Sequence, residues 1–110
     1  MRKAEIKLHG KTAGWLTQDD QGYHFEYDVA YRSRPDAEPV SLTLPVRAVP
    51  YTSKVLFPFF DGLIPEGWLL AIAEKNWKVN PRDRMGLLLA CCKDCIGAVS
   101  VYPVNMEEGL

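Results

Sequence analysis

The stretch FFDGLIPEGWLL, from Phe59 to Leu70, combines a dense cluster of apolar side chains with a break in helical structure. Gly62 and Pro65 interrupt any single helix through it, so the pattern predicts a turn that gathers large side chains at a corner. Such side chains belong either to the core of the domain or to a surface that binds a partner. The partner-binding interpretation assigns these residues to the surface: Phe59, Phe60, Leu63, Ile64, Glu66, Trp68 and Leu69.

The chain before this corner has the period-2 alternation that is typical of antiparallel strands. We expect four strands that pair as a meander: Ala4 to Leu8, Ala13 to Thr17, Tyr23 to Tyr27 and Val40 to Leu44. A loop with two prolines and mixed charges, Arg32 to Pro39, separates the last two. The first half of the chain is therefore predicted to be sheet.

The second half changes to helical spacing. A short helix is predicted over Thr52 to Asp61, with a late start or a kink at Pro58. A second helix fits Pro65 to Trp77, and Asn80 caps a third. The apolar face of the third helix is Met85, Leu88, Leu89 and Cys92.

The order of strands, helices and strand predicts a single α+β domain over residues 1–110. We expect an antiparallel β-sheet meander with a helical segment packed on one side and a returning C-terminal strand, Ala98 to Tyr102, which Pro103 ends. The predicted core includes Ile6, Leu8, Leu16, Phe25, Leu42, Leu44, Leu88 and Val99.

Composition excludes several classes of function. With 110 residues, 47% hydrophobic and 25% charged, the chain has ordinary globular composition. A formal net charge of −1 provides no broad basic field, so direct nucleic-acid binding is not expected. No segment resembles a signal peptide or a membrane span, and three cysteines fit a reducing compartment. The sequence therefore predicts a cytoplasmic protein without membrane contact.

Cysteine chemistry is the main competing interpretation. Cys92 and Cys95 form a CxxC pair, but zinc normally needs four ligands, and His9 or His24 would have to come from the distant meander. A redox pair needs the motif at the start of a helix, whereas this one lies at the end of a predicted helix. A small metal or thiol protein thus remains an alternative. Neither histidine has a convincing acid–base partner, so we expect no enzyme and no cofactor.

Three pieces of the sequence resemble a known family in the same order. SLTLPV, FFDGLIPEGW and CKDCIGAVSVYP are similar to the amino-terminal subdomain of the HipA serine/threonine kinase toxins. The pattern spans roughly Lys3 to Pro103. The glycine-rich loop and the His-x-Asp and Asp-Phe-Gly motifs that phosphoryl transfer requires are missing, so the resemblance implies this subdomain without the kinase core.

The resemblance also implies partners. A free-standing copy of the subdomain is similar to the HipS antitoxins of the three-part HipBST systems. It implies an antitoxin that docks on the amino-terminal lobe of a separately encoded HipT-like kinase, in a ternary complex with a HipB-like DNA-binding protein. The alternative is an accessory subunit that completes or stabilises the kinase without inhibiting it. Trp68 is the expected anchor of the contact, and Trp77 the expected core tryptophan.

Overall fold

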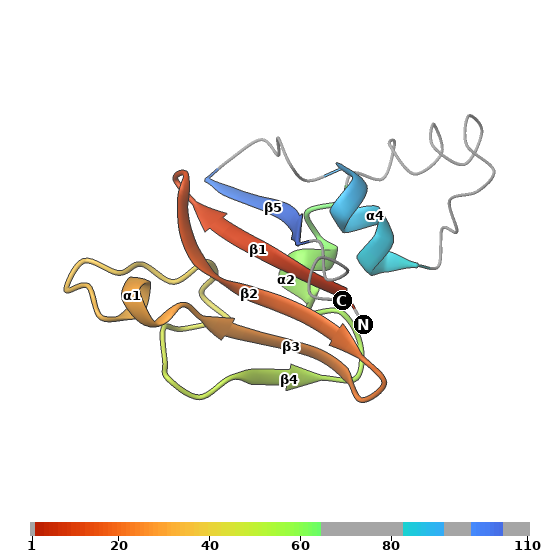
Figure 1. Cartoon of the computed structure of the whole chain (residues 1–110), viewed down its shortest axis with the longest axis horizontal. Helices are drawn as coiled ribbons and strands as arrows, with labels where there is room; N and C mark the ends of the chain where they lie inside the picture. The colour runs from red at the N-terminus through yellow and green to blue at the C-terminus, as the bar shows by residue number, and fades with distance from the viewer. Residues whose placement is uncertain (1, 65–82, 92–97, 105–110) are drawn as a thin grey trace.

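The computed structural model of the protein describes residues 2–64, 83–91 and 98–104 (Figure 1). Its strands form one five-stranded antiparallel sheet in the order β4-β3-β2-β1-β5. The strands are β1 (Arg2–Leu8), β2 (Lys11–Asp19), β3 (Gly22–Tyr27), β4 (Tyr51–Ser53) and β5 (Val99–Val104). The described helices are α1 (Val29–Arg32), α2 (Pro58–Asp61) and α4 (Arg84–Cys91). The predicted meander with a returning C-terminal strand is confirmed.

Two tight turns set the register of the first three strands. His9 and Gly10 join β1 to β2 with φ angles of 52° and 80°, the positive values that a two-residue hairpin turn prefers. Gly22, with φ 126°, begins β3 where a side chain would meet the carbonyl oxygen of Ser53. The hairpins therefore follow from residues that tolerate these backbone angles.

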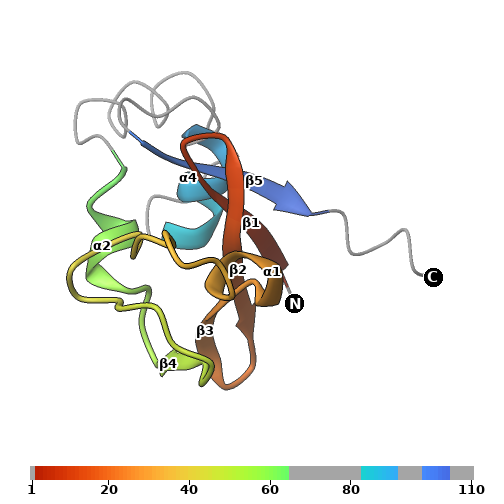
Figure 2. The same cartoon turned by 90° about the vertical axis from the view of Figure 1, so that its left-hand side faces the viewer.

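The helices α2 and α4 pack on one face of the sheet, as Figure 2 shows. Between them and the sheet lies a single apolar core, and the largest fully buried side chains are Phe25, Phe60, Ile6, Leu16, Met85, Leu87, Leu88 and Val101. Of the predicted core residues, these are buried: Ile6, Leu8, Leu16, Phe25, Leu44, Leu88 and Val99. The α+β class and the one-sided packing of the helices are thus confirmed.

Leu42 is the predicted core residue that is wrong, because its side chain is 93% exposed. Residues 40–44 form a turn and not the predicted fourth strand: the Leu44 amide donates to the Ser41 carbonyl at 3.0 Å. Val40 and Leu44 point into the core at the two ends of the turn, which leaves Leu42 at its tip. The apolar residues alternate with polar ones in the sequence whether this segment forms a strand or a turn, so the pattern does not distinguish the two structures.

Other boundaries also differ from the prediction. Residues 52–61 are not one helix, since β4 occupies the start of that range and α2 begins only at Pro58. The last strand continues through Pro103 to Val104, because β5 is an edge strand and an edge tolerates a residue without an amide hydrogen. The predicted helix at 65–77 and the cap at Asn80 lie outside the described residues.

The turn at residues 40–44 is held by the hydroxyl group of Tyr27. This buried hydroxyl donates to the Leu44 carbonyl and accepts from the Val40 amide at 3.0 Å. Burial raises the pKa of Tyr27 to about 12, so the hydroxyl keeps its proton near neutral pH. The Tyr27 hydroxyl therefore provides hydrogen-bond partners for two buried backbone groups, which strand pairing would have provided if residues 40–44 formed the predicted strand.

Replacing Tyr27 by Phe should destabilise the domain by about 1–3 kcal/mol, because two buried backbone groups lose their partner. Tyr51→Phe is the matched control, since the Tyr51 hydroxyl donates to the exposed Pro45 carbonyl. Urea unfolding of both variants measures the difference. Equal stability of the two variants would contradict the role given to Tyr27.

Candidate functional site

The corner predicted from the sequence starts with the four-residue helix α2. Phe57 precedes the helix in an extended conformation, and Pro58 takes the first helical position, where a missing amide hydrogen costs nothing. The helix ends at Asp61, and the next residue, Gly62, donates its amide to the Pro58 carbonyl at 2.9 Å. The next turn carries Ile64 back into the core.

The described residues of the corner divide into buried and partly exposed ones. Phe60 is 0% and Ile64 is 4% exposed, so both belong to the core of the domain. Phe59 and Leu63 are only partly buried and pack against that core. Among the described residues of the prediction, Phe59 and Leu63 are therefore the ones that a partner can reach. Glu66, Trp68 and Leu69 lie outside the described part of the chain.

An ion pair joins the corner to α4. The Arg84 guanidinium donates through Nε to Oδ1 of Asp61, the last residue of α2, at 2.5 Å. The Arg84 and Asp61 side chains are 32% and 41% exposed, so the pair lies at the rim of the core. It fixes the orientation of α2 relative to α4.

The residue before Arg84 ties α4 to the sheet. Asp83 pairs with Arg2 at the start of β1, with contacts of 2.6 and 2.9 Å, and its Oδ1 also accepts from the Gly86 amide at 3.1 Å. Arg2 also donates to the side-chain oxygen of Gln18 on β2. Asp83 thus caps α4 and binds it to the start of β1.

These contacts change the ionisation of Asp83. The hydrogen bond from Arg2 holds the pKa of this carboxyl below its ordinary value, partial burial opposes the shift, and the Gly86 amide adds to it. The same hydrogen bond raises the pKa of Arg2. The ion pair is therefore present throughout the neutral range.

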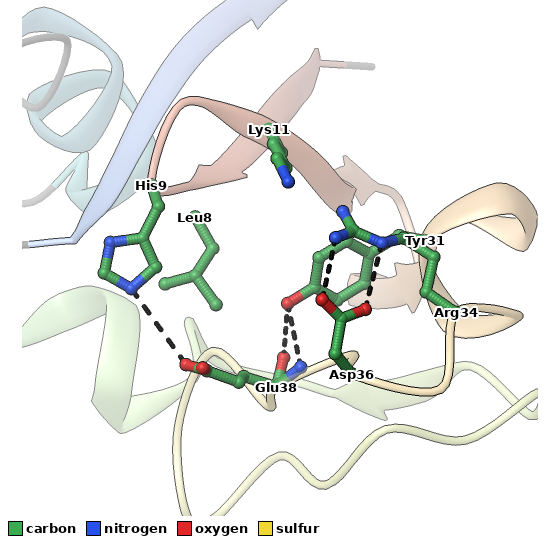
Figure 3. Close-up of a pocket in the computed structure, with 7 residues that line it drawn as sticks. All are labelled: Leu8, His9, Lys11, Tyr31, Arg34, Asp36 and Glu38. Carbon is green, nitrogen blue, oxygen red and sulfur yellow. Dashed lines mark hydrogen bonds and ion pairs between the residues drawn. The ribbon is translucent and has the colours of Figure 1, made fainter.

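A small pocket lies between the β1–β2 turn and the loop after α1 (Figure 3). Two contacts join polar groups across it, since Arg34 binds Asp36 at 3.0 Å and His9 lies 4.0 Å from Glu38, and Lys11 also lines the pocket. The Tyr31 hydroxyl donates to the Glu38 carbonyl at 2.6 Å and accepts from its amide. Both positive and negative side chains therefore line a volume of about 140 Å³.

The competing site types have little support in the described residues. Within residues 2–64, 83–91 and 98–104, no group of histidine, cysteine and acidic side chains could hold a metal ion. His24 pairs with Asp19 at 3.0 Å on the sheet surface. Cys92 and Cys95 lie outside the described residues. Among the helices that the structure describes, none has the length and apolar character needed to cross a membrane.

Comparison with known proteins decides the family. Residues 4–102 match the family model of the HipA N-terminal domain. The chain belongs to the HipA N-terminal domain family. A solved structure, the N-terminal domain of HipA toxin, superposes with a TM-score of 0.73 at 30% identity, and the match covers 96% of this chain and 95% of that one. The resemblance inferred from the sequence is therefore confirmed, and the match is to a non-catalytic domain of HipA.

The relatives of the domain differ in size. A Haemophilus influenzae protein of unassigned function is 33% identical, and the match covers 92% of each chain. Two Sinorhizobium fredii proteins, named "Putative kinase Y4mE" and "Putative kinase Y4dM", are 32% and 30% identical. The match covers 97% and 94% of this chain but only 26% and 27% of theirs. The domain is thus about a quarter of these longer proteins and most of the small one.

Sequence reasoning did not predict the ion pairs that join the described part of the corner to α4 and α4 to the sheet. Asp61 and Arg84 are 23 residues apart, and Arg2 and Asp83 are 81 apart, so spacing could not reveal either pair. The one local signal was two adjacent residues of opposite charge, Asp83 and Arg84, at the start of a predicted helix. Two adjacent residues of opposite charge can each form an ion pair with a different neighbouring element.

The Arg2–Asp83 pair should make stability depend on pH at the acid end. Because the folded pKa of Asp83 is depressed, its contribution is complete above the ordinary value of 3.8 and is lost as the pH falls through the lower folded value. Asp83→Asn keeps a capping side chain but removes the charge. We expect this variant to be less stable than the wild type at about pH 7 and nearly equal to it at about pH 2.

Unfolding of both proteins by urea across this range measures the effect, with the exposed Asp20→Asn as the control for general charge. A deficit of Asp83→Asn that stays constant down to the acid end would show that the ion pair is not its cause.

Proposed function

We propose that this domain is an antitoxin that binds and neutralises a separately encoded HipT-like serine/threonine kinase by docking on its amino-terminal lobe. The observation that carries the proposal is the size of the relatives. The same domain makes up about a quarter of two proteins named as kinases and nearly all of a small Haemophilus influenzae protein. A domain that accompanies a kinase in one chain is suited to bind a kinase from another.

The corner is the best candidate for the contact surface. A separate domain must hold its partner by surface contacts alone, so it needs exposed apolar anchors on a rigid base. Phe59 and Leu63 provide partly exposed apolar surface, and the buried Phe60 between them fixes the base. The Asp61–Arg84 pair restrains the same helix. Trp68, which follows in the sequence, is proposed as the main anchor.

Neutralisation needs no chemistry from this domain. Phosphoryl transfer requires both kinase lobes and the nucleotide phosphates to be positioned together. A protein bound to the amino-terminal lobe can restrain the nucleotide loop, block the cleft or prevent lobe closure. We further propose a HipB-like DNA-binding protein as the third member of the complex.

The second candidate function is a non-inhibitory accessory subunit. The small relative supports this candidate equally, because a missing domain can be restored in trans to stabilise the kinase. The two functions differ in one measurable quantity, the kinase activity of the complex. An antitoxin lowers this activity, whereas an accessory subunit leaves it unchanged or raises it.

Co-expression tests the proposal directly. The domain should relieve growth arrest caused by a HipT-like kinase that lacks its own copy of this domain, and the two proteins should co-purify. A purified complex should phosphorylate its substrate more slowly than the free kinase. If the proteins do not co-purify and the arrest persists, the antitoxin proposal is wrong; if they co-purify with full kinase activity, the accessory function replaces it.

Trp68→Ala should weaken kinase binding by about thirtyfold, because truncating an interface anchor commonly costs 2 kcal/mol or more. Its melting temperature should change little. Phe60→Ala is the contrasting variant, since removing a fully buried phenylalanine should cost about 3–5 kcal/mol of folding stability. Calorimetric titration and thermal melting of both variants give the comparison. A large melting shift for Trp68→Ala would place this residue in the core.

A further inference from the structure

The face of the sheet that turns away from α2 and α4 has its own pattern of side chains. No described helix covers it, as Figure 2 shows, and its central residues are only half-buried. Its aromatic side chains already attract cations of the same chain. Lys3 Nζ lies 4.9 Å from the ring centroid of Trp15, and Lys7 Nζ lies 4.9 Å from that of Tyr102. This face therefore favours contact between positive charge and aromatic rings.

A hollow of about 300 Å³ lies on this face over β2, β3 and the start of β4. Its lining residues are Trp15, Thr17, His24, Glu26, Pro50 and Thr52. The strand register places Trp15 opposite Glu26, and Thr17 opposite His24, which in turn lies opposite Thr52. The hollow is thus built on two neighbouring cross-strand rows, so regular sheet structure holds its walls in place.

The charge of the hollow is unbalanced. Glu26 is exposed, and within the part of the chain that the structure describes it forms no ion pair. His24 is already paired with Asp19, and the Trp15 indole N–H donates to Asp28 at 3.3 Å. Lys3 belongs to β1. The strand that carries Trp15, β2, lies between β1 and the strands β3 and β4. One aromatic wall and one unpaired carboxylate therefore remain for a ligand.

We propose that this hollow binds an arginine side chain of a partner protein. A planar guanidinium can stack on Trp15 while it donates two hydrogen bonds to the Glu26 carboxylate, which a compact ammonium cannot do. The chain contains the same stacking internally, since the Arg47 guanidinium lies 3.6 Å from the ring centroid of Tyr51. The site faces away from the corner, so it does not rest on the antitoxin proposal and allows a second protein to bind together with a kinase.

A titration with N-acetyl-arginine amide tests the site on the isolated protein. In two-dimensional NMR spectra at constant ionic strength, the probe should shift the Trp15 indole signal and the amides of β2 and β3 around the hollow, with saturation in the millimolar range. N-acetyl-citrulline amide, which has nearly the same shape without the charge, should shift them far less. N-acetyl-lysine amide should bind more weakly than the arginine probe.

Two variants test whether the Glu26 carboxylate is the charge that binds the arginine probe. Glu26→Gln should weaken binding of the arginine probe by about tenfold, the order expected for a lost hydrogen bond to a charged group. Glu5→Gln is the matched control, because Glu5 also lies opposite Trp15 but on β1, where it accepts from Thr12. It should leave binding unchanged.

Three outcomes would overturn the proposal: no saturable shifts at the hollow, equal binding of the citrulline probe, or equal losses in Glu26→Gln and Glu5→Gln. Kinase neutralisation by Glu26→Gln is a separate readout and should stay at the wild-type level. Failure of the arginine site is therefore distinguishable from failure of the antitoxin function.

Discussion

The packing of Phe60 against Phe25 joins the two halves of the chain. Phe60 is completely buried, with its ring centroid 5.4 Å from that of Phe25 on the central part of the sheet and 6.2 Å from that of Phe57. Phe59 lies 5.1 Å from Phe60, centroid to centroid, so a partly exposed ring sits directly on a buried one. The part of the candidate contact surface that the structure describes is therefore continuous with the core.

Charge supports the same arrangement from α4. Asp83 and Arg84 are adjacent and have opposite charges, and each pairs with a different neighbour, Arg2 of β1 and Asp61 of α2. The helix is thus fastened to the sheet on one side and to the corner on the other. Because these pairs are about a third exposed, their energetic contribution is small. The two ion pairs select one orientation of α2 and α4, which already pack against the sheet through the apolar core.

The fold could be predicted because its strands and its third predicted helix have clear periods. The region from 40 to 53 could not, since Val40, Leu42 and Leu44 alternate equally well in a strand and in a turn whose two ends are buried. What decides between them is the hydroxyl of Tyr27, a contact over 13 and 17 residues that no local pattern contains. The strand at residues 51–53 is too short to have a period.

The corner was predictable from its density of apolar residues, but not which of them face outward. Phe59 and Phe60 are adjacent and identical in type, and only the packing against Phe25 buries one and leaves the other partly exposed. The hollow beside Trp15 escaped the sequence for a similar reason. Trp15, Glu26 and Pro50 come together only through the pairing of three strands.

Hydrogen–deuterium exchange of the domain, alone and with a HipT-like kinase that lacks its own copy, tests the central claim most directly. If the corner is the contact surface, amides of residues 59–64 should exchange more slowly in the complex, while amides of β2 and β3 around the hollow should keep their rates. A complex that forms without slower exchange at residues 59–64 would contradict the account and place the kinase elsewhere on the domain.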